Sequence, residues 1–216
     1  MHCHPEHDFL AQYAAGSLPL PVALCISVHL GFCAQCRGDL RALQSLGGLL
    51  FEQLEAAPVG DDLLQRVMQR IDGDLDAGAA TTARAAAAAT DALPKSLRGL
   101  VPDGYDGLHW MTILPGLRVA KLAASDDEYQ VSLHRIRPGA KVGKHDHRGL
   151  EITQVLRGSF SDELGIYSDG DFVLREPGMQ HRPLAAQNEE CICLALQSAP
   201  VRFTGYFWRL LNPFLR

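Results

Sequence analysis

The chain has 216 residues, a formal net charge of −5 at pH 7 and a hydrophobic fraction of 47%, which fits two small folded domains and excludes a chain that is disordered throughout. The mild acidity disfavours a nucleic-acid binder, which would show a basic surface. No apolar run reaches the roughly 18 residues that cross a membrane, and the first residues, MHCHPEHDF, lack the basic and apolar regions of a signal peptide. We therefore expect a cytoplasmic protein that binds neither DNA nor a membrane.

Most of the six cysteines and nine histidines gather in four short segments, at 2–7, 25–36, 145–147 and 181–193. In a reducing compartment, neighbouring cysteines are more often metal ligands or redox-active thiols than structural disulfides. The clustering therefore directs attention to metal chemistry.

Between residues 8 and 76 the apolar residues recur at helical spacing, which predicts about four short helices. The first ends at Gly16, and the second begins at Pro19 and Pro21 and runs towards Cys36. The apolar stripes of the third and fourth helices consist of Leu40, Leu43, Leu46, Leu50 and Leu54, and of Leu63, Leu64, Val67, Met68, Ile71 and Leu75.

Residues 77–96, AGAATTARAAAAATDALPKS, separate this region from the rest of the chain. Alanine favours helices, but the stretch has no apolar stripe for a fifth helix to bury. We predict a flexible linker at 77–96, between a helical domain of residues 1–76 and a second domain of residues 97–216.

From about residue 97 the pattern changes to short runs rich in strand-forming residues, separated by turn sequences that contain glycine and proline. Many strands at close intervals, without helices between them, predict an antiparallel barrel or sandwich. The aromatic C-terminal stretch is expected to pack on this barrel or at an interface.

The strongest feature of the helical half is the run from His29 to Cys36, HLGFCAQC. His29 and Cys33 are four residues apart, so a helix presents both on one face, and Cys36 follows one turn later. A tetrahedral zinc ion takes four nitrogen or sulfur ligands, and His4 or His7 is available as the fourth. Such a site would stabilise a domain too small to bury a large core. In the alternative interpretation, the cysteines are small buried residues and His29 is a polar surface residue.

An N-terminal histidine followed by HxxxCxxC on the second helix resembles the zinc-containing anti-sigma domain, and most of all its ChrR-type branch. In that branch the motif follows a helix with a tyrosine-alanine-alanine-glycine stretch, here residues 13–16. The resemblance implies that the zinc ligands are His4, His29, Cys33 and Cys36. His7 is the alternative to His4, and Cys3 and Cys25 have no place in the pattern.

The resemblance also implies a function. In this family the helical domain inserts between the two conserved domains of an ECF-type sigma factor and occludes its contacts with RNA polymerase. The apolar stripes at 43–54 and 63–75 would then serve the sigma factor in part. For most of these residues, however, we expect a place in the core of the helical bundle.

A second group of ligand-type residues lies in the strand-rich half. The two histidines of His145-Asp-His147 point to one face of a strand, Glu151 follows at an even spacing, and His181 comes just after a turn. Their spacing, G-x5-HxH-x3-E-x6-G, matches the first motif of the cupin family at every position, and Gly170, Gly178 and His181 match the second.

The second cupin motif is incomplete, because Glu176 stands where proline is expected and Ala185 where asparagine is expected. By resemblance the metal ligands are His145, His147, Glu151 and His181. The ChrR-type resemblance favours zinc, although these ligands also suit iron, manganese and nickel. The fold class expected is thus a small all-α zinc-binding domain followed by an all-β cupin barrel.

Cys191 and Cys193 alternate along a strand and therefore lie on one face of it. They form either an oxidisable thiol pair near the metal or part of the apolar core, and the sequence does not choose between the two.

Three functions are compatible with these motifs. The first is an anti-sigma factor that is not an enzyme, with a cupin that receives an oxidative-stress-type signal, of small-molecule or oxidant character, and promotes release of sigma. The second is a cupin metalloenzyme, a dioxygenase or isomerase with an accessory zinc domain, for which Tyr129, His134 and Asp146 are the available acid–base groups. The third, a DNA-binding zinc finger, is disfavoured by its ligand spacing and by the scarcity of basic residues near Cys33. We expect the first.

Overall fold

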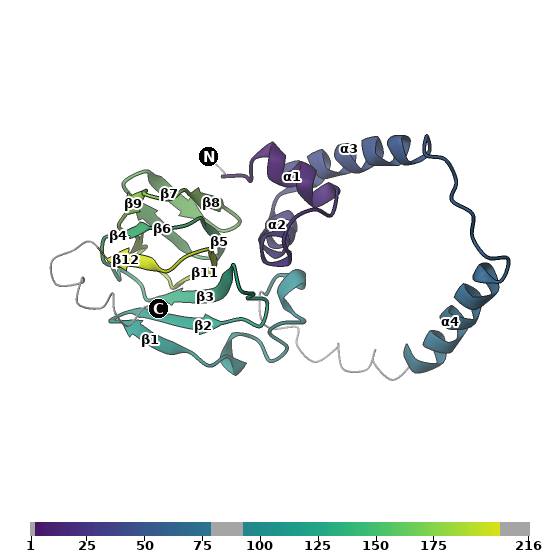
Figure 1. The fold of residues 1–216 in the computed structure, drawn as a ribbon. Coiled ribbons are helices and arrows are strands. Elements are labelled where there is room, and N and C mark those ends of the chain that lie inside the picture. Colours follow the sequence, from purple (N-terminus) through teal and green to yellow (C-terminus); the bar gives the residue numbers. More distant parts are fainter. Residues whose placement is uncertain (1–2, 79–92, 204–216) are drawn as a thin grey trace.

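The computed structural model describes residues 3–78 and 93–203. Four α-helices occupy the first of these ranges, and a β-barrel forms most of the second (Figure 1). The expected order, a small all-α region followed by an all-β barrel, is confirmed.

The four helices are α1 (His7–Ala14), α2 (Leu20–Phe32), α3 (Ala34–Phe51) and α4 (Leu63–Gly78). Gly16, which follows the C-cap residue Ala15 of α1, has a φ of +68°, a conformation that glycine adopts at little cost and that ends the helix. Proline stands at the start of α2, where its missing N–H costs no hydrogen bond.

The expectation that one helix runs from Pro19 to Cys36 is wrong. Helix α2 ends at Phe32, Cys33 is extended (φ −99°, ψ 111°), and α3 leaves at an angle of 120° to α2. The Cys33 sulfur caps the new helix by accepting a hydrogen bond from the Cys36 N–H at 3.4 Å. His29, Cys33 and Cys36 are therefore brought together by a sharp bend and not by one straight helical face.

Burial differs sharply between the helices. The first two helices and the start of α3 share a core that includes Leu10, Ile26, Val28 and Cys36, and Cys25 is fully buried in it. The expectation that most of the later stripe residues also form this core is wrong. The exposed members are Leu46, Leu50, Leu54, Leu64, Val67, Met68 and Ile71.

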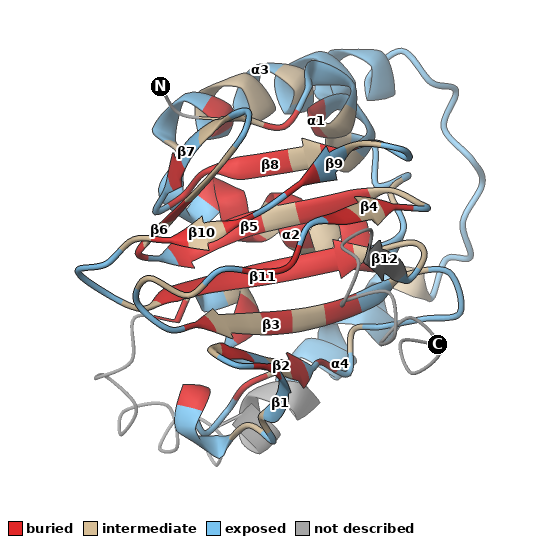
Figure 2. Cartoon of the chain, turned by 90° about the vertical axis from the view of Figure 1, so that its left-hand side faces the viewer, coloured by how far each residue is buried: buried red, intermediate tan, exposed pale blue. Residues whose placement is uncertain are grey.

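Within residues 93–203, the barrel is built from twelve short strands. They are β1 (Met111–Leu114), β2 (Leu117–Lys121), β3 (Gln130–Ile136), β4 (His145–His147), β5 (Glu151–Arg157), β6 (Ser159–Asp162), β7 (Gly165–Ser168), β8 (Phe172–Arg175), β9 (Gln180–His181), β10 (Leu184–Ala185), β11 (Cys191–Gln197) and β12 (Val201–Phe203). The six-stranded sheet has the order β1-β2-β3-β11-β5-β8, and two three-stranded sheets have the orders β10-β6-β7 and β12-β4-β9 (Figure 2). All pairings between these strands are antiparallel.

The central strands β5 and β11 of the six-stranded sheet are buried on both faces. Along β5 and β11, Ile152, Leu156 and Leu194 belong to the core that contains α2, whereas Val155 and Cys193 belong to a second core inside the barrel. Alternating residues of a strand point to opposite faces, so α2 packs against the outside of the sheet. The helical region is therefore docked directly on the barrel (Figure 1).

Two sequence-based expectations fall wholly or partly outside the described residues. Most of the predicted linker, residues 79–92, is among them, so the division into 1–76, 77–96 and 97–216 stays a prediction. Within the described part, α4 extends to Gly78, and Leu97 is buried at the end of a short 3-10 helix, η2 (Lys95–Leu97). Residues 204–216 of the aromatic C-terminal stretch also lie outside.

Within the described ranges, no single helix is both long and apolar enough to cross a membrane. Helices α2 and α3 meet the length and composition requirement only as a pair, and the pair is bent by 120°.

Candidate metal centres

The N-terminal group consists of His4, His29, Cys33 and Cys36, and one ligand atom of each lies within 4.8 Å of the others. The His4 Nδ1 atom is 3.4 Å from both sulfur atoms, and the His29 Nε2 atom is 3.3 Å from the Cys36 sulfur. These spacings suit a tetrahedral zinc ion, whose ligands at about 2.0–2.3 Å stand about 3.3–3.8 Å apart. His7, the alternative fourth ligand, is exposed at the start of α1 and is not in the group.

A backbone carbonyl of the barrel fixes the orientation of His29. The His29 Nδ1 atom lies 2.9 Å from the Gly170 carbonyl oxygen. Because a carbonyl can only accept, Nδ1 carries the proton and Nε2 offers its lone pair to the group. Gly170 belongs to the docking turn (residues 170–172), which joins β7 to β8.

The docking turn also holds the segment that carries His4. The Cys3 N–H donates to the Asp171 Oδ1 atom at 2.8 Å, and the Phe172 N–H donates to the Cys3 carbonyl at 2.9 Å. Asp171 is buried, and its second oxygen accepts from the Ser168 N–H at 2.8 Å. The barrel therefore positions two of the four residues of the N-terminal group.

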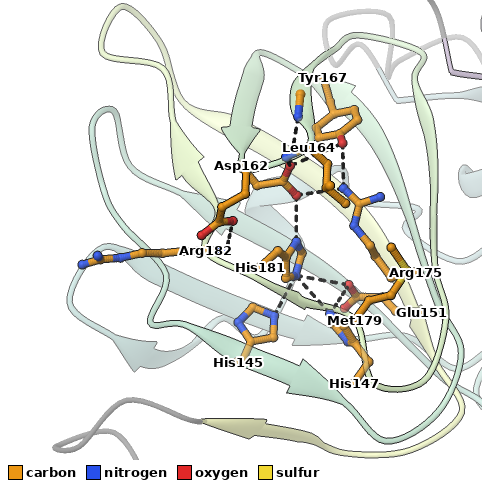
Figure 3. A network of polar contacts seen from close by, with 12 residues as sticks. His145, His147, Glu151, Asp162, Leu164, Tyr167, Arg175, Met179, His181 and Arg182 are labelled. Carbon is orange, nitrogen blue, oxygen red and sulfur yellow. Dashed lines mark hydrogen bonds and ion pairs between the residues drawn. The ribbon is translucent and has the colours of Figure 1, made fainter.

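The barrel group consists of His145, His147, Glu151 and His181, all buried, from β4, β5 and β9 (Figure 3). The His181 Nε2 atom lies 2.9 Å from that of His145 and 3.0 Å from that of His147. The Glu151 Oε2 atom is 3.3 Å from the His147 Nε2 atom and 3.8 Å from that of His181. All four predicted residues thus converge on one point.

Two histidines of the barrel group, His145 and His181, direct their Nδ1 protons away from the centre of the group. The His145 Nδ1 atom donates to the Gly143 carbonyl at 2.8 Å, and the His181 Nδ1 atom donates to the Asp162 carboxylate at 2.9 Å. Their Nε2 atoms are then lone-pair acceptors that face each other with no proton between them. A cation among these atoms removes this repulsion, so the donor set fits a divalent metal.

A second layer of polar residues supports the barrel group (Figure 3). The Asp162 carboxylate accepts from Arg175 at 2.8 Å as well as from His181, and the same Arg175 nitrogen donates to the Tyr167 hydroxyl at 2.7 Å. The Gln197 side chain donates to the Glu151 Oε1 atom at 2.7 Å. Such partners fix the orientation of metal ligands and commonly raise metal affinity by about 10- to 100-fold.

The pKa shifts in the barrel group favour the protonation states that bind a metal. Burial lowers the pKa of His145 to about 4 and also lowers the pKa of His147. Burial alone would raise the pKa of Glu151, but His147, His145, His181 and the Gln197 hydrogen bond together hold it below its usual value. At neutral pH the His145 and His147 imidazoles are therefore neutral and the Glu151 carboxyl group is ionised.

The other residues singled out in the sequence are not members of the barrel group, although His134 and Cys193 line the same cavity as three of its members. The Cys191 and Cys193 sulfur atoms are 3.6 Å apart in the core inside the barrel. Tyr129 packs at the edge of the core that contains α2, and Ser132 contacts His134 at 3.1 Å. Asp146 belongs to β4 between the two histidines and is not part of the group.

The two departures from the second cupin motif also leave the barrel group intact. Glu176 is exposed after β8, and Ala185 is buried in β10, where it pairs with Phe160. Sequence reasoning missed Asp162, Arg175 and the docking turn. No spacing rule points to them, because their roles come from strand neighbours that the fold creates.

The fold and the two ligand groups define a class of protein: a short helical region with a His2Cys2 group, docked on a cupin barrel with a His3Glu group. Comparisons with known proteins agree. Residues 104–200 match the family described as the ChrR Cupin-like domain. The anti-sigma-E factor ChrR of Cereibacter sphaeroides is 33% identical over 213 residues, which cover 99% of this chain and 97% of that protein.

A solved structure is similar as well. The crystal structure of Rhodobacter sphaeroides SigE in complex with the anti-sigma ChrR contains a chain with a TM-score of 0.79 and 31% identity, covering 91% of this chain and 99% of that one. The chain belongs to the family of ChrR-type anti-sigma factors. Because that family is regulatory, the comparisons support the anti-sigma interpretation and not the metalloenzyme interpretation.

The two groups are expected to differ in the pH dependence of zinc binding. Burial and a hydrogen bond that the Cys36 thiol donates to the Cys33 sulfur raise the pKa of the metal-free Cys36 thiol to about 12. Because zinc binds the thiolate, binding between about pH 6 and 8 releases at least one proton, and the apparent affinity rises at least about tenfold per pH unit. The barrel histidines His145 and His147 are already neutral there, so the affinity of the barrel group changes less.

Zinc titrations against a chromophoric chelator at several pH values measure this difference. The variant H145A/H147A isolates the N-terminal group, and C36S isolates the barrel group. Equal pH slopes for the two variants would contradict the assignment of ligands.

Proposed function

We propose that this protein is a cytoplasmic anti-sigma factor. Its helical domain, residues 1–76, sequesters an ECF-type sigma factor, and its cupin domain, residues 97–216, receives an oxidative-stress-type signal and promotes release. Family membership carries the proposal, and an exposed apolar surface on the helices supports it. Because a sigma factor acts on RNA polymerase, the proposed partner itself places the protein in the cytoplasm.

The supporting surface is the exposed helical face, formed by apolar residues of α3 and α4. On α4, Leu64, Val67, Met68 and Ile71 follow the i, i+3, i+4, i+7 spacing of one helical face, and each is at least 45% exposed. On and after α3 the exposed residues are Leu46, Leu49, Leu50, Phe51 and Leu54. A face of this kind is typical of a helix that binds another protein.

The same two helices stand away from the rest of the molecule. Figure 1 shows α3 projecting from the bundle and α4 lying apart from both the bundle and the barrel. A partner that inserts between the two helices would bury their apolar residues, each worth about 1.5–3 kcal/mol when fully covered. The solved complex of SigE with ChrR makes a sigma factor the partner that we propose.

Metal has a separate part in each domain. We propose that zinc is bound by His4, His29, Cys33 and Cys36, where it ties the N-terminal segment to the bend between α2 and α3. The structural role follows from the small core of this region, because such domains gain folding free energy from the metal. For His145, His147, Glu151 and His181 we propose zinc first, with iron, manganese or nickel as chemically suitable replacements.

A signal at the barrel group has a short route to the N-terminal group. Strand β8 begins at Phe172, which stacks edge-on against His29 at 5.9 Å between ring centroids, and ends at Arg175. Arg175 contacts Asp162, which holds His181. A change at the barrel metal that displaces His181 would therefore move the strand that carries the docking turn, and with it two proposed zinc ligands.

The sigma-binding part of the proposal is tested by capture from a lysate of the native host. The full chain is expected to recover one ECF-type sigma factor, and a chelator is expected to abolish recovery. The variant L64D/M68D should weaken binding of that purified factor by about 100-fold, since two buried apolar contacts of about 1.5 kcal/mol each are lost.

The matched control is Q65D/Q69D, which adds the same two charges to α4 outside the apolar stripe and should bind normally. All four positions are exposed, so circular dichroism and thermal unfolding should not change. Recovery of no sigma factor by a folded, zinc-loaded chain, or equal loss in both variants, would contradict the proposal.

The coupling between the domains is tested with D171A. Loss of the hydrogen bond from Cys3 frees the segment that carries His4, so affinity at the N-terminal group should fall about tenfold, as for other residues that support metal ligands. Cobalt titration reports this group selectively, because only its thiolates give a charge-transfer band. In cells, sigma activity should be higher before challenge, and the added response to a photosensitiser and light should be smaller.

The control for this experiment is D169A, an exposed aspartate two residues earlier in the chain. If D171A binds metal and responds in cells as the native protein does, the docking turn does not couple the domains.

A further inference from the structure

The barrel encloses a cavity of about 360 Å³, within the range of about 300–1,000 Å³ that is common for small-molecule sites. Leu117, Val119, Val142 and Phe160 supply apolar side chains to its wall. Met111 and Ile113 also line it and are more than a third exposed, so they mark its opening. The space is thus largely apolar and accessible from one side.

One part of the cavity wall is the barrel group. His145, Glu151 and His181 line the cavity, so a metal among them would be in reach of a molecule inside it. Strand alternation explains this placement, because Glu151 and Thr153 of β5 face the interior while Ile152 faces α2. The metal-binding end and the apolar wall therefore belong to one enclosed space.

The net charge at the metal-binding end of the cavity favours binding of an anion there. The three imidazoles are neutral ligands, Glu151 contributes one negative charge, and the buried Asp162–Arg175 pair cancels itself. A divalent metal therefore leaves a net charge of about +1, which is costly in an apolar interior unless it is neutralised. Lys121 adds a further positive group to the lining.

We propose that the cavity is a binding site for a small carboxylate with an aliphatic chain. The carboxylate neutralises the metal end beside His145, Glu151 and His181, and the chain lies along Leu117, Val119 and Phe160. This inference rests on the proposed function, in which the barrel group holds a metal, and it adds the chemical class of the molecule that the cupin recognises. A metal-bound hydroxide would also balance the charge, but it would leave the apolar wall unused.

Isothermal titration of the zinc-loaded full chain with decanoate, at concentrations below micelle formation, tests the proposal. One decanoate per chain is expected to bind, with affinity at least roughly tenfold above that of acetate, which lacks the chain, and of 1-decanol, which lacks the charge. The variant H145A, which weakens metal binding in the barrel, should lose decanoate affinity by a similar factor. No binding of decanoate, or equal binding of 1-decanol or acetate, would overturn the proposal.

Two variants fill the cavity. V119F places a ring in its wall, and I113W does so at the opening, where partial exposure makes misfolding less of a concern. Each should lower decanoate affinity at least roughly tenfold. The matched control is I166F, a strand residue that is 77% exposed on β7, and its affinity should equal that of the native chain. Unchanged affinity in both filled variants would overturn the assignment to this cavity.

Binding of the captured sigma factor is measured on the same preparations. If sigma binds normally but decanoate does not, only this inference fails. If sigma does not bind while decanoate does, the proposed function fails and the cavity assignment stands.

Discussion

The structure depends on one contact, in which the Gly170 carbonyl of the barrel accepts the Nδ1 proton of His29. It fixes the tautomer of a proposed zinc ligand and docks α2 on the sheet at the same time. Gly170 has a φ of +88°, and a side chain there would place Cβ 2.8 Å from that of Phe32. Glycine is therefore required both by the backbone conformation and by the close approach of α2 to the barrel. The orientation of the N-terminal group is a property of the whole chain, not of the helices alone.

The helical region divides its apolar residues between two tasks. Leu10, Ile26 and Val28 are buried in a core shared with the barrel, so α1 and α2 are committed to the fold. The exposed helical face on α3 and α4 is left for a partner. A protein that must release its partner benefits from this division, because the docked core persists while the exposed face exchanges between states. In the proposed function, the signal acts by changing the relative free energy of those states.

The sequence predicted the helical and strand-rich halves and both ligand groups, because helix periodicity and ligand spacing are local properties of the chain. It did not predict the bend at Cys33, where the extended backbone of that residue ends α2 and its sulfur caps α3. Neither did it predict the exposure of residues such as Leu64, since periodicity shows which residues share a face but not what covers that face. Asp162 and Asp171 were missed because their partners lie far away in the chain and meet them only after folding.

The most direct test of this account is hydrogen–deuterium exchange of the zinc-loaded full chain, alone and bound to its captured sigma factor. The account predicts new protection in residues 46–54 and 63–72, where the apolar side chains are exposed in the free protein. Strands β5 and β11 should keep the exchange rates that they have in the free protein. Protection confined to the barrel, with the exposed helical face unchanged, would contradict the account.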